Sequence, residues 1–130
     1  MARLNDAPKE ALEQVWLFEW ADTMARLKWP ELSLLFAIPN GGSRHPAEAA
    51  HLKGQGVRSG VPDVFLPVPR GGYHGLFVEM KRRKGGVVSG NQKDWIGALN
   101  GQGYRAVVCR GFQEAADCIE GYLGQMADGK

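Results

Sequence analysis

Apolar side chains recur at helical spacing in three long stretches of the chain. In the first stretch, residues 8–28, they are Leu12, Val15, Trp16, Trp20, Met24 and Leu27. Residues at these intervals share one face of a helix, so the pattern predicts an amphipathic helix over 8–28. The same reasoning predicts a helix that starts at Ser89 and stops at Gly101, and a final helix over 112–123. A short helix is expected over 47–53, after a proline that suits a first helical turn.

Four stretches rich in β-branched, aliphatic and aromatic residues predict strands. They are residues 32–38, 64–68, 73–80 and 104–109. The segment 69–72 contains a proline and two glycines, so it predicts a hairpin turn between the second and third strands. Helices and strands alternate along the chain, which indicates an α/β fold. We therefore expect a single domain with a mixed sheet of about four strands, flanked by helices.

The whole chain of 130 residues is expected to be this one domain, with its core over about 8–124 and frayed ends at 1–7 and 125–130. Its 44% hydrophobic and 23% charged residues are typical of an ordinary globular protein. No apolar stretch approaches the roughly 20 residues that cross a bilayer, and no signal-peptide segment opens the chain. We expect a cytoplasmic protein without membrane contact. The two cysteines form no zinc-binding pattern and no plausible disulfide framework.

Charge is distributed unevenly. The formal net charge of +2 is too small to indicate a nucleic-acid partner by itself, but residues 81–84 are four consecutive cations. Such a run is either a solvated turn after a strand or a local basic surface that attracts phosphate. The chain contains no glycine-rich phosphate loop, so no nucleotide cofactor is expected.

Two carboxylates are predicted to face each other across the hairpin. A turn centred near Gly71 aligns Asp63 with Glu79 at the open end of the two strands. Directly opposed residues have Cβ atoms only about 4.5–5.5 Å apart. Because side chains alternate along a strand, Lys81 shares a face with Glu79, while Met80 points the other way and leaves its backbone carbonyl as a possible ligand.

Two ionised carboxylates at this spacing repel each other, so one must keep its proton or a cation must lie between them. Carboxylate and carbonyl oxygens suit a hard ion, which points to Mg²⁺ or Mn²⁺ rather than zinc. Lys81 would then stand beside the ion, where it orients or helps to deprotonate an attacking water and stabilises charge on a phosphate. The alternative is a surface Glu–Lys pair and an unrelated aspartate in a turn.

Four motifs occur in order along the chain: I-P-N-G-G at 38–42, G-V-R-S-G-V-P-D at 56–63, E-M-K at 79–81 and S-G-N-Q at 89–92. The P-D and E-x-K motifs resemble those of the PD-(D/E)xK nuclease superfamily. With the other two, the series resembles the VRR-NUC family of virus-type replication and repair nucleases, over nearly the whole chain. The resemblance implies a restriction-endonuclease-like αβββαβ core.

The resemblance also implies site roles. Asp63 and Glu79 correspond to the metal ligands and Lys81 to the catalytic lysine. Gln92 corresponds to a glutamine that contacts the site or the phosphate, although it also fits a capping box at the start of its helix.

The family pattern further includes a glutamate near the start of the first helix. Glu13 is the best match, and it independently falls inside the apolar stripe of that helix, where a carboxylate needs an explanation. In this role it would be a further metal ligand. The alternatives are that Glu13 meets solvent or an arginine, and that Glu19 serves the site instead.

Five residues in loops and short helices are expected to contact DNA. An asparagine before two glycines would bring backbone amides near the phosphates, and four cations would follow the backbone. These residues are Asn40, Arg44, Lys53, Arg58 and Arg82.

The resulting hypothesis is a Mg²⁺- or Mn²⁺-dependent endodeoxyribonuclease. Similar standalone members of the family suggest a homodimer that cuts branched DNA such as four-way junctions, because a two-fold axis relates two sites to two strands. The alternatives are a non-catalytic nucleic-acid-binding module and a sequence-specific restriction-type endonuclease. The chain has four tryptophans, of which we expect Trp16 and Trp95 to pack against the sheet.

Overall fold

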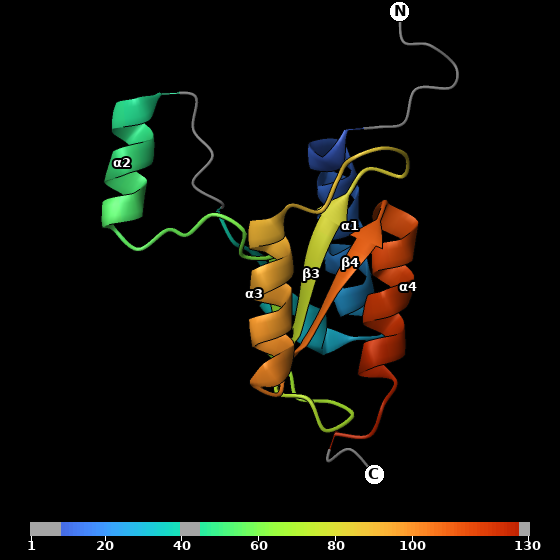
Figure 1. Cartoon of the computed structure of the whole chain (residues 1–130). Coiled ribbons are helices and arrows are strands. Elements are labelled where there is room, and N and C mark those ends of the chain that lie inside the picture. Colours follow the sequence, from blue (N-terminus) through green and yellow to red (C-terminus); the bar gives the residue numbers. More distant parts are fainter. Residues whose placement is uncertain (1–8, 40–44, 128–130) are drawn as a thin grey trace, which may run out of the picture.

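The computed structural model describes residues 9–39 and 45–127, and Figure 1 shows how their helices and strands are arranged. In chain order the elements are helix α1 (Glu10–Leu27), 3₁₀ helix η1 (Pro30–Leu34), strand β1 (Phe36–Ala37), helix α2 (Pro46–Gly54), strand β2 (Val64–Leu66), strand β3 (Leu76–Lys81), helix α3 (Gly90–Gly101), strand β4 (Arg105–Arg110) and helix α4 (Phe112–Leu123).

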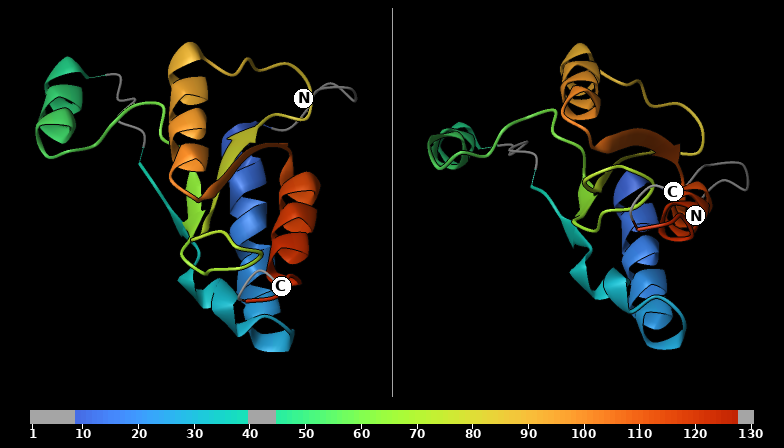
Figure 2. Two further views of the ribbon diagram at one scale, coloured as in Figure 1. Left: turned by 60° about the horizontal axis from the view of Figure 1, so that its bottom comes forward. Right: turned by 90° about the horizontal axis from the view of Figure 1, so that it is seen from below.

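A four-stranded sheet with the order β1-β2-β3-β4 forms the centre of the molecule. Strand β2 pairs antiparallel with both β1 and β3, whereas β3 and β4 are parallel and are connected through α3. Helix α3 covers one face of the sheet, and α1 and α4 lie side by side on the other (Figure 2). The predicted α/β domain with a mixed sheet and an αβββαβ core is confirmed.

Strand β3 is buried along its whole length, as its uninterrupted apolar run predicts. Its residues Leu76, Val78 and Met80 belong to the hydrophobic core that the sheet forms with α1 and α4. Buried members of that core from the two helices are Leu17, Ala21, Ala115, Ala116, Ile119, Tyr122 and Leu123. Since side chains alternate along a strand, Glu79 and Lys81 lie on the opposite face, toward α3.

The hairpin register is the predicted one. Val64 pairs with Val78, so the next position toward the open end aligns Asp63 with Glu79. Both strands are shorter near the turn than expected. Arg70 pairs with Tyr73 in a separate β-bridge, and the two glycines between them have positive φ.

The strand expected over residues 32–38 is wrong for most of its length. The chain forms η1 instead, and β1 keeps only two exposed residues. Pro30 suits the first turn of a helix, where its missing N–H is not needed. Leu32 and Leu35 are both buried at a spacing of three residues, so helical rather than alternating periodicity brings these leucines to the core.

The end of α4 is bound to the hairpin turn. The Tyr122 hydroxyl donates a hydrogen bond of 2.6 Å to the Val68 carbonyl, and the Gly71 N–H donates one of 2.8 Å to the Met126 carbonyl. The fraying expected from residue 125 therefore does not start there. The other positions expected to fray, 1–7 and 128–130, lie outside the described residues.

Helix α2 stands apart from the sheet and from the other helices in every view (Figures 1 and 2), and none of its residues is buried. Its low content of large apolar side chains, in Pro46–Gly54, gives it little to bury. Over residues 9–39 and 45–127, no helix combines the length and the apolar character that crossing a membrane requires.

The tryptophans are placed differently from the expectation. Trp20 and Trp29 pack against the buried core. The guanidinium of Arg83 lies over the ring of Trp16, 5.9 Å from its centroid, and Trp95 lines a cleft beside α2. Helical spacing identifies the face of the helix on which an aromatic residue lies. Which other element packs against that face depends on the tertiary arrangement.

Candidate active site

Asp63 and Glu79 meet at the open end of the hairpin, where β2 begins and β3 approaches its last residue. The Asp63 Oδ2 accepts a hydrogen bond of 2.7 Å from the Met80 N–H, which fixes the aspartate against β3. Both carboxylates line one pocket of about 310 Å³, together with Gln92. The structure thus brings together the two acidic residues that the hairpin register predicts to be neighbours.

The environment raises the pKa of both carboxyl groups. The pKa of Glu79 is raised from 4.5 to about 8, mainly by burial and secondly by the nearby charge of Asp63. The charge of Lys81 acts in the opposite direction. Burial also raises the pKa of Asp63, although the hydrogen bond from Met80 works in the other direction. A hydrogen bond between the two groups lowers the pKa of Asp63 and raises that of Glu79, so the two carboxyl groups titrate as a pair that retains a proton above the usual range of either group.

Lys81 and Gln92 both contact the Glu79 carboxylate. The Lys81 Nζ lies 3.7 Å from Glu79 Oε2, and the lysine side chain is only 8% exposed. The Gln92 Nε2 donates a hydrogen bond of 2.8 Å to the same oxygen. Gln92 also completes a capping box, since its Oε1 accepts from the Ser89 N–H and its own N–H donates to the Ser89 Oγ. The two roles considered for Gln92 therefore coexist, one through each end of its amide.

The donor set fits a hard divalent cation such as Mg²⁺ or Mn²⁺. Two carboxylates that share a proton in the absence of metal can exchange that proton for an ion between them. Because Met80 directs its N–H toward Asp63, its carbonyl leaves the strand on the same side, from where it could add a third oxygen. Within the described part of the chain, no cluster of three or more His, Cys, Asp or Glu side chains forms a ready-made chelate.

Glu13 is fully buried, as its place in the apolar stripe predicts, but it lies outside the pocket of the carboxylate pair. Its Oε2 accepts a hydrogen bond of 2.8 Å from the Arg83 Nε, and its Oε1 accepts one of 3.0 Å from the Phe112 N–H. Phe112 opens α4, where a negative charge is favourable. A Cβ on Gly111 would be 3.1 Å from the Glu13 Oε2, so the backbone approaches this carboxylate closely. Glu13 therefore joins α1 to the loop after β3, through its ion pair with the half-exposed Arg83, and to the start of α4, through the Phe112 N–H.

Glu10 is the α1 carboxylate that does line the pocket, with Asp63 and Glu79. Its charge contributes to raising the pKa of both groups. Glu19 is exposed and lies further along the helix. The sequence contains a signal for Glu10, because residues three apart share a helix face and Glu10 precedes Glu13 by one turn, at the end of α1 where the helix begins.

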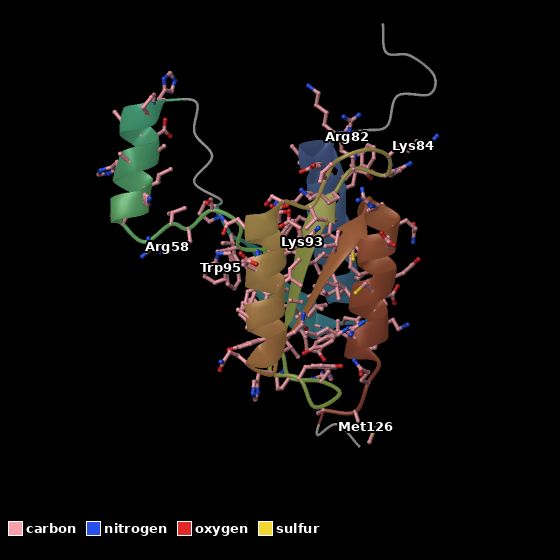
Figure 3. The ribbon with its side chains drawn as sticks, viewed as in Figure 1. Arg58, Arg82, Lys84, Lys93, Trp95 and Met126 are labelled. Atoms are coloured by element: carbon pink, nitrogen blue, oxygen red, sulfur yellow. The ribbon has the colours of Figure 1, made fainter. Side chains whose placement is uncertain are left out.

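The run of four cations at 81–84 does not form one surface. Lys81 is buried at the carboxylate pair and Arg83 pairs with a buried glutamate, whereas Arg82 and Lys84 are carried by the loop after β3 (Figure 3). Arg110 holds that loop by donating a hydrogen bond of 2.6 Å to the Gly85 carbonyl. Of the four cations, only Lys81 is buried at the site, whereas the side chain of Arg83 is half exposed even though it pairs with the buried Glu13.

The residues expected to contact DNA fall into separate groups. Lys53 lies in the last turn of α2 and Arg58 in the segment that follows, and the Arg58 Nη1 donates a hydrogen bond of 3.4 Å to the Lys53 carbonyl. Arg82 belongs to the loop after β3, away from those two cations (Figure 3). Asn40 and Arg44 lie outside the described residues.

The fold and the site together define a nuclease-type domain with the acidic pair and lysine of the PD-(D/E)xK arrangement. The family model described as VRR-NUC domain matches residues 8–113. A solved structure described as a VRR_NUC domain protein is 30% identical and has a TM-score of 0.81, over 95% of this chain and 96% of that chain. No curated protein matches the chain. The chain belongs to the VRR-NUC family.

Proposed function

We propose that this protein is a metal-dependent DNA endonuclease that hydrolyses phosphodiester bonds with Mg²⁺ or Mn²⁺. One observation carries the proposal: Asp63 and Glu79 face each other in a pocket, with the buried Lys81 ammonium 3.7 Å from the Glu79 carboxylate. A structural ion pair would not require two carboxyl groups with raised pKa values at the same point. Membership of a nuclease family supports this interpretation of the pocket.

The residues of the chain divide the chemistry among them. Asp63, Glu79 and the Met80 carbonyl would hold the ion, which supplies a water of lowered pKa and polarises the phosphodiester. Lys81 is fixed beside Glu79, from where its ammonium orients the attacking water and stabilises negative charge on the phosphate. Gln92 holds the Glu79 carboxylate in position through its hydrogen bond of 2.8 Å.

Glu10 is the α1 carboxylate that we assign to this site, in place of Glu13 and Glu19. It lines the pocket in the first turn of its helix, and it is close enough to influence the titration of both acidic groups. From there it can accept a hydrogen bond from a water in the pocket. Glu13, by contrast, already binds a guanidinium and a backbone N–H.

Branched DNA, such as a four-way junction, is the substrate that we propose, cut by a homodimer. In a symmetric pair each copy addresses one of two equivalent strands. The support is an exposed apolar surface where α1 meets β1, on which Leu12 and Val15 of α1 are each about half exposed. Val15, Phe18 and Ala37 line a shallow hollow on the same side. Contiguous apolar surface of this kind is typical of interaction sites.

The test compares cleavage of labelled duplex, single-stranded, flap and four-way-junction DNA in Mg²⁺, Mn²⁺ and EDTA. We expect metal-dependent cutting that is fastest on branched DNA. Asp63→Asn and Glu79→Gln should each abolish cutting while DNA binding survives, because each removes a charged ligand without removing a phosphate contact. Glu19→Gln is the matched control, since it removes an exposed carboxylate from α1.

Each other outcome identifies an alternative. Binding without cleavage in any metal would indicate a non-catalytic nucleic-acid-binding module. Discrete bands from a supercoiled plasmid would indicate a sequence-specific restriction-type enzyme. Sedimentation at several protein concentrations, with and without the junction, tests the dimer, and a monomer that cuts junctions at full rate would refute it.

A further inference from the structure

A second cleft lies next to the pocket of the carboxylate pair, between α2 and α3. It has a volume of about 420 Å³, and the residues that line it include Lys53, Val57, Arg58, Ser59, Asn91 and Trp95. Figure 3 shows Arg58, in the segment that follows α2, near Trp95 on α3. Ser59 and Asn91 also line the pocket of the carboxylate pair, so the two cavities share one wall.

The shared wall is held by specific contacts. The Asn91 Nδ2 donates hydrogen bonds of 2.8 Å to the Ser59 carbonyl and 3.0 Å to the Ser59 Oγ. Gly60, with φ of +90°, lies so close that a Cβ there would be 2.7 Å from the same nitrogen. The wall therefore requires glycine at this position, and its geometry is defined before any ligand binds.

Trp95 connects this cleft to the candidate active site. It follows Asn91 by four residues, so both side chains lie on one face of α3. It follows Gln92, which donates to Glu79, by three residues, or about 4.5 Å along the helix axis. Stacked nucleotides rise about 3.4 Å each. Trp95 thus lies one helical turn beyond the residue that contacts Glu79, in the cleft that shares a wall with the carboxylate pocket.

The cleft combines the two features with which proteins bind unpaired nucleotides. Its interior offers the half-buried indole of Trp95 and the small apolar side chains Ala49, Ala50 and Val57. Its rim carries Lys53 and Arg58, which make no ion pair within the described part of the chain. Aromatic side chains stack on bases of any sequence, and cations beside them bind the backbone.

We propose that this cleft holds an unpaired nucleotide next to the phosphate to be cut, with its base stacked on Trp95 and its backbone beside Lys53 and Arg58. The inference rests on the proposed nuclease function and specifies how the substrate is recognised. It explains a preference for branched DNA, because nucleotides at a branch point leave the duplex with less loss of stacking than paired ones. A fully paired duplex would leave the cleft empty.

The experiment measures binding by fluorescence anisotropy in EDTA, with two DNAs of equal length: a fully paired duplex and the same duplex with a short single-stranded flap. Trp95→Ala should weaken binding of the flap DNA about tenfold and leave the paired duplex within twofold. Trp95→Phe should retain most of the affinity, since it keeps an aromatic ring. Trp16→Ala, a half-buried tryptophan on α1, is the matched control and should not distinguish the two DNAs.

A second measurement uses the unaltered protein. Walking an abasic residue along the flap should reduce affinity by a similar factor at one position, nearest the branch, and this result does not depend on the folding of any variant. Equal effects of Trp95→Ala on both DNAs, or no loss at any abasic position, would overturn the inference. If the unaltered protein cuts DNA in that case, the nuclease proposal stands. If it neither binds nor cuts any DNA, the nuclease proposal has failed first.

Discussion

Metal binding at the Asp63–Glu79 pair is predicted to release a proton. In the metal-free protein, burial and the charge of Asp63 raise the pKa of Glu79 to about 8, so this group is mostly protonated at pH 7. A cation between the carboxylates favours their ionised forms. From that pKa, binding should release about 0.9 proton per site at pH 7 and about 0.1 at pH 9.

The same linkage determines the direction in which metal affinity and protein stability change with pH. Affinity for the ion should rise about tenfold per pH unit below pH 8 and level off above it. Stability of the metal-free protein should change in the opposite sense. Because folding raises the pKa of Glu79 from 4.5 to about 8, the folded state binds more protons than the unfolded state within this window. The free energy of unfolding should therefore fall as the pH rises through it.

Isothermal titration calorimetry with Mg²⁺ measures the proton release directly, in buffers that differ in ionisation enthalpy. The apparent binding enthalpy should vary with the buffer at pH 7 and become nearly independent of it at pH 9. Glu19→Gln should titrate as the unaltered protein does. A binding enthalpy that is independent of buffer at pH 7 would refute the reasoning, since it would mean that no proton is shared by the pair.

Three further predictions concern single residues. Lys81→Ala should reduce turnover by orders of magnitude while calorimetry finds metal affinity largely unchanged, and loss of metal binding would contradict a catalytic role. Glu13→Ala should lower the free energy of unfolding by about 2 kcal/mol, because the Phe112 N–H loses its acceptor; urea denaturation measures this, with Glu19→Ala as the exposed control. Glu10→Gln should reduce the cleavage rate about tenfold or more, and an equal reduction in Glu19→Gln would contradict the assignment of the pocket.

The register of the hairpin could be predicted from the sequence because local chemistry determines it. Two glycines fix the turn, the turn fixes the register, and the register aligns Asp63 with Glu79. The position of Gln92 could also be predicted from the sequence, since a capping box places its side chain at the start of a helix that follows β3. In both cases the determining contacts lie within a few residues or across one strand pair.

The rest depends on contacts between distant segments. The apolar stripe shows that Glu13 is buried, but its partners lie 70 and 99 residues further along the chain, and no local pattern announces them. Residues 32–38 have strand-like composition, yet Leu32 and Leu35 are buried by a 3₁₀ turn against α1. Propensity is a weak guide wherever tertiary packing decides the outcome.

Two glutamates one helical turn apart have different roles at the start of α1. Glu13 binds Arg83, which follows Lys81 by two residues, and the first N–H of α4. These bonds hold the first turn of α1 against the end of β3, and Glu10 lies in that turn and lines the pocket. We therefore expect the ion pair of Glu13 to help position Glu10 beside the carboxylates that β2 and β3 provide. A substitution that weakens this ion pair should displace one wall of the pocket as well as lower stability, so Glu13 influences the site through position rather than through contact.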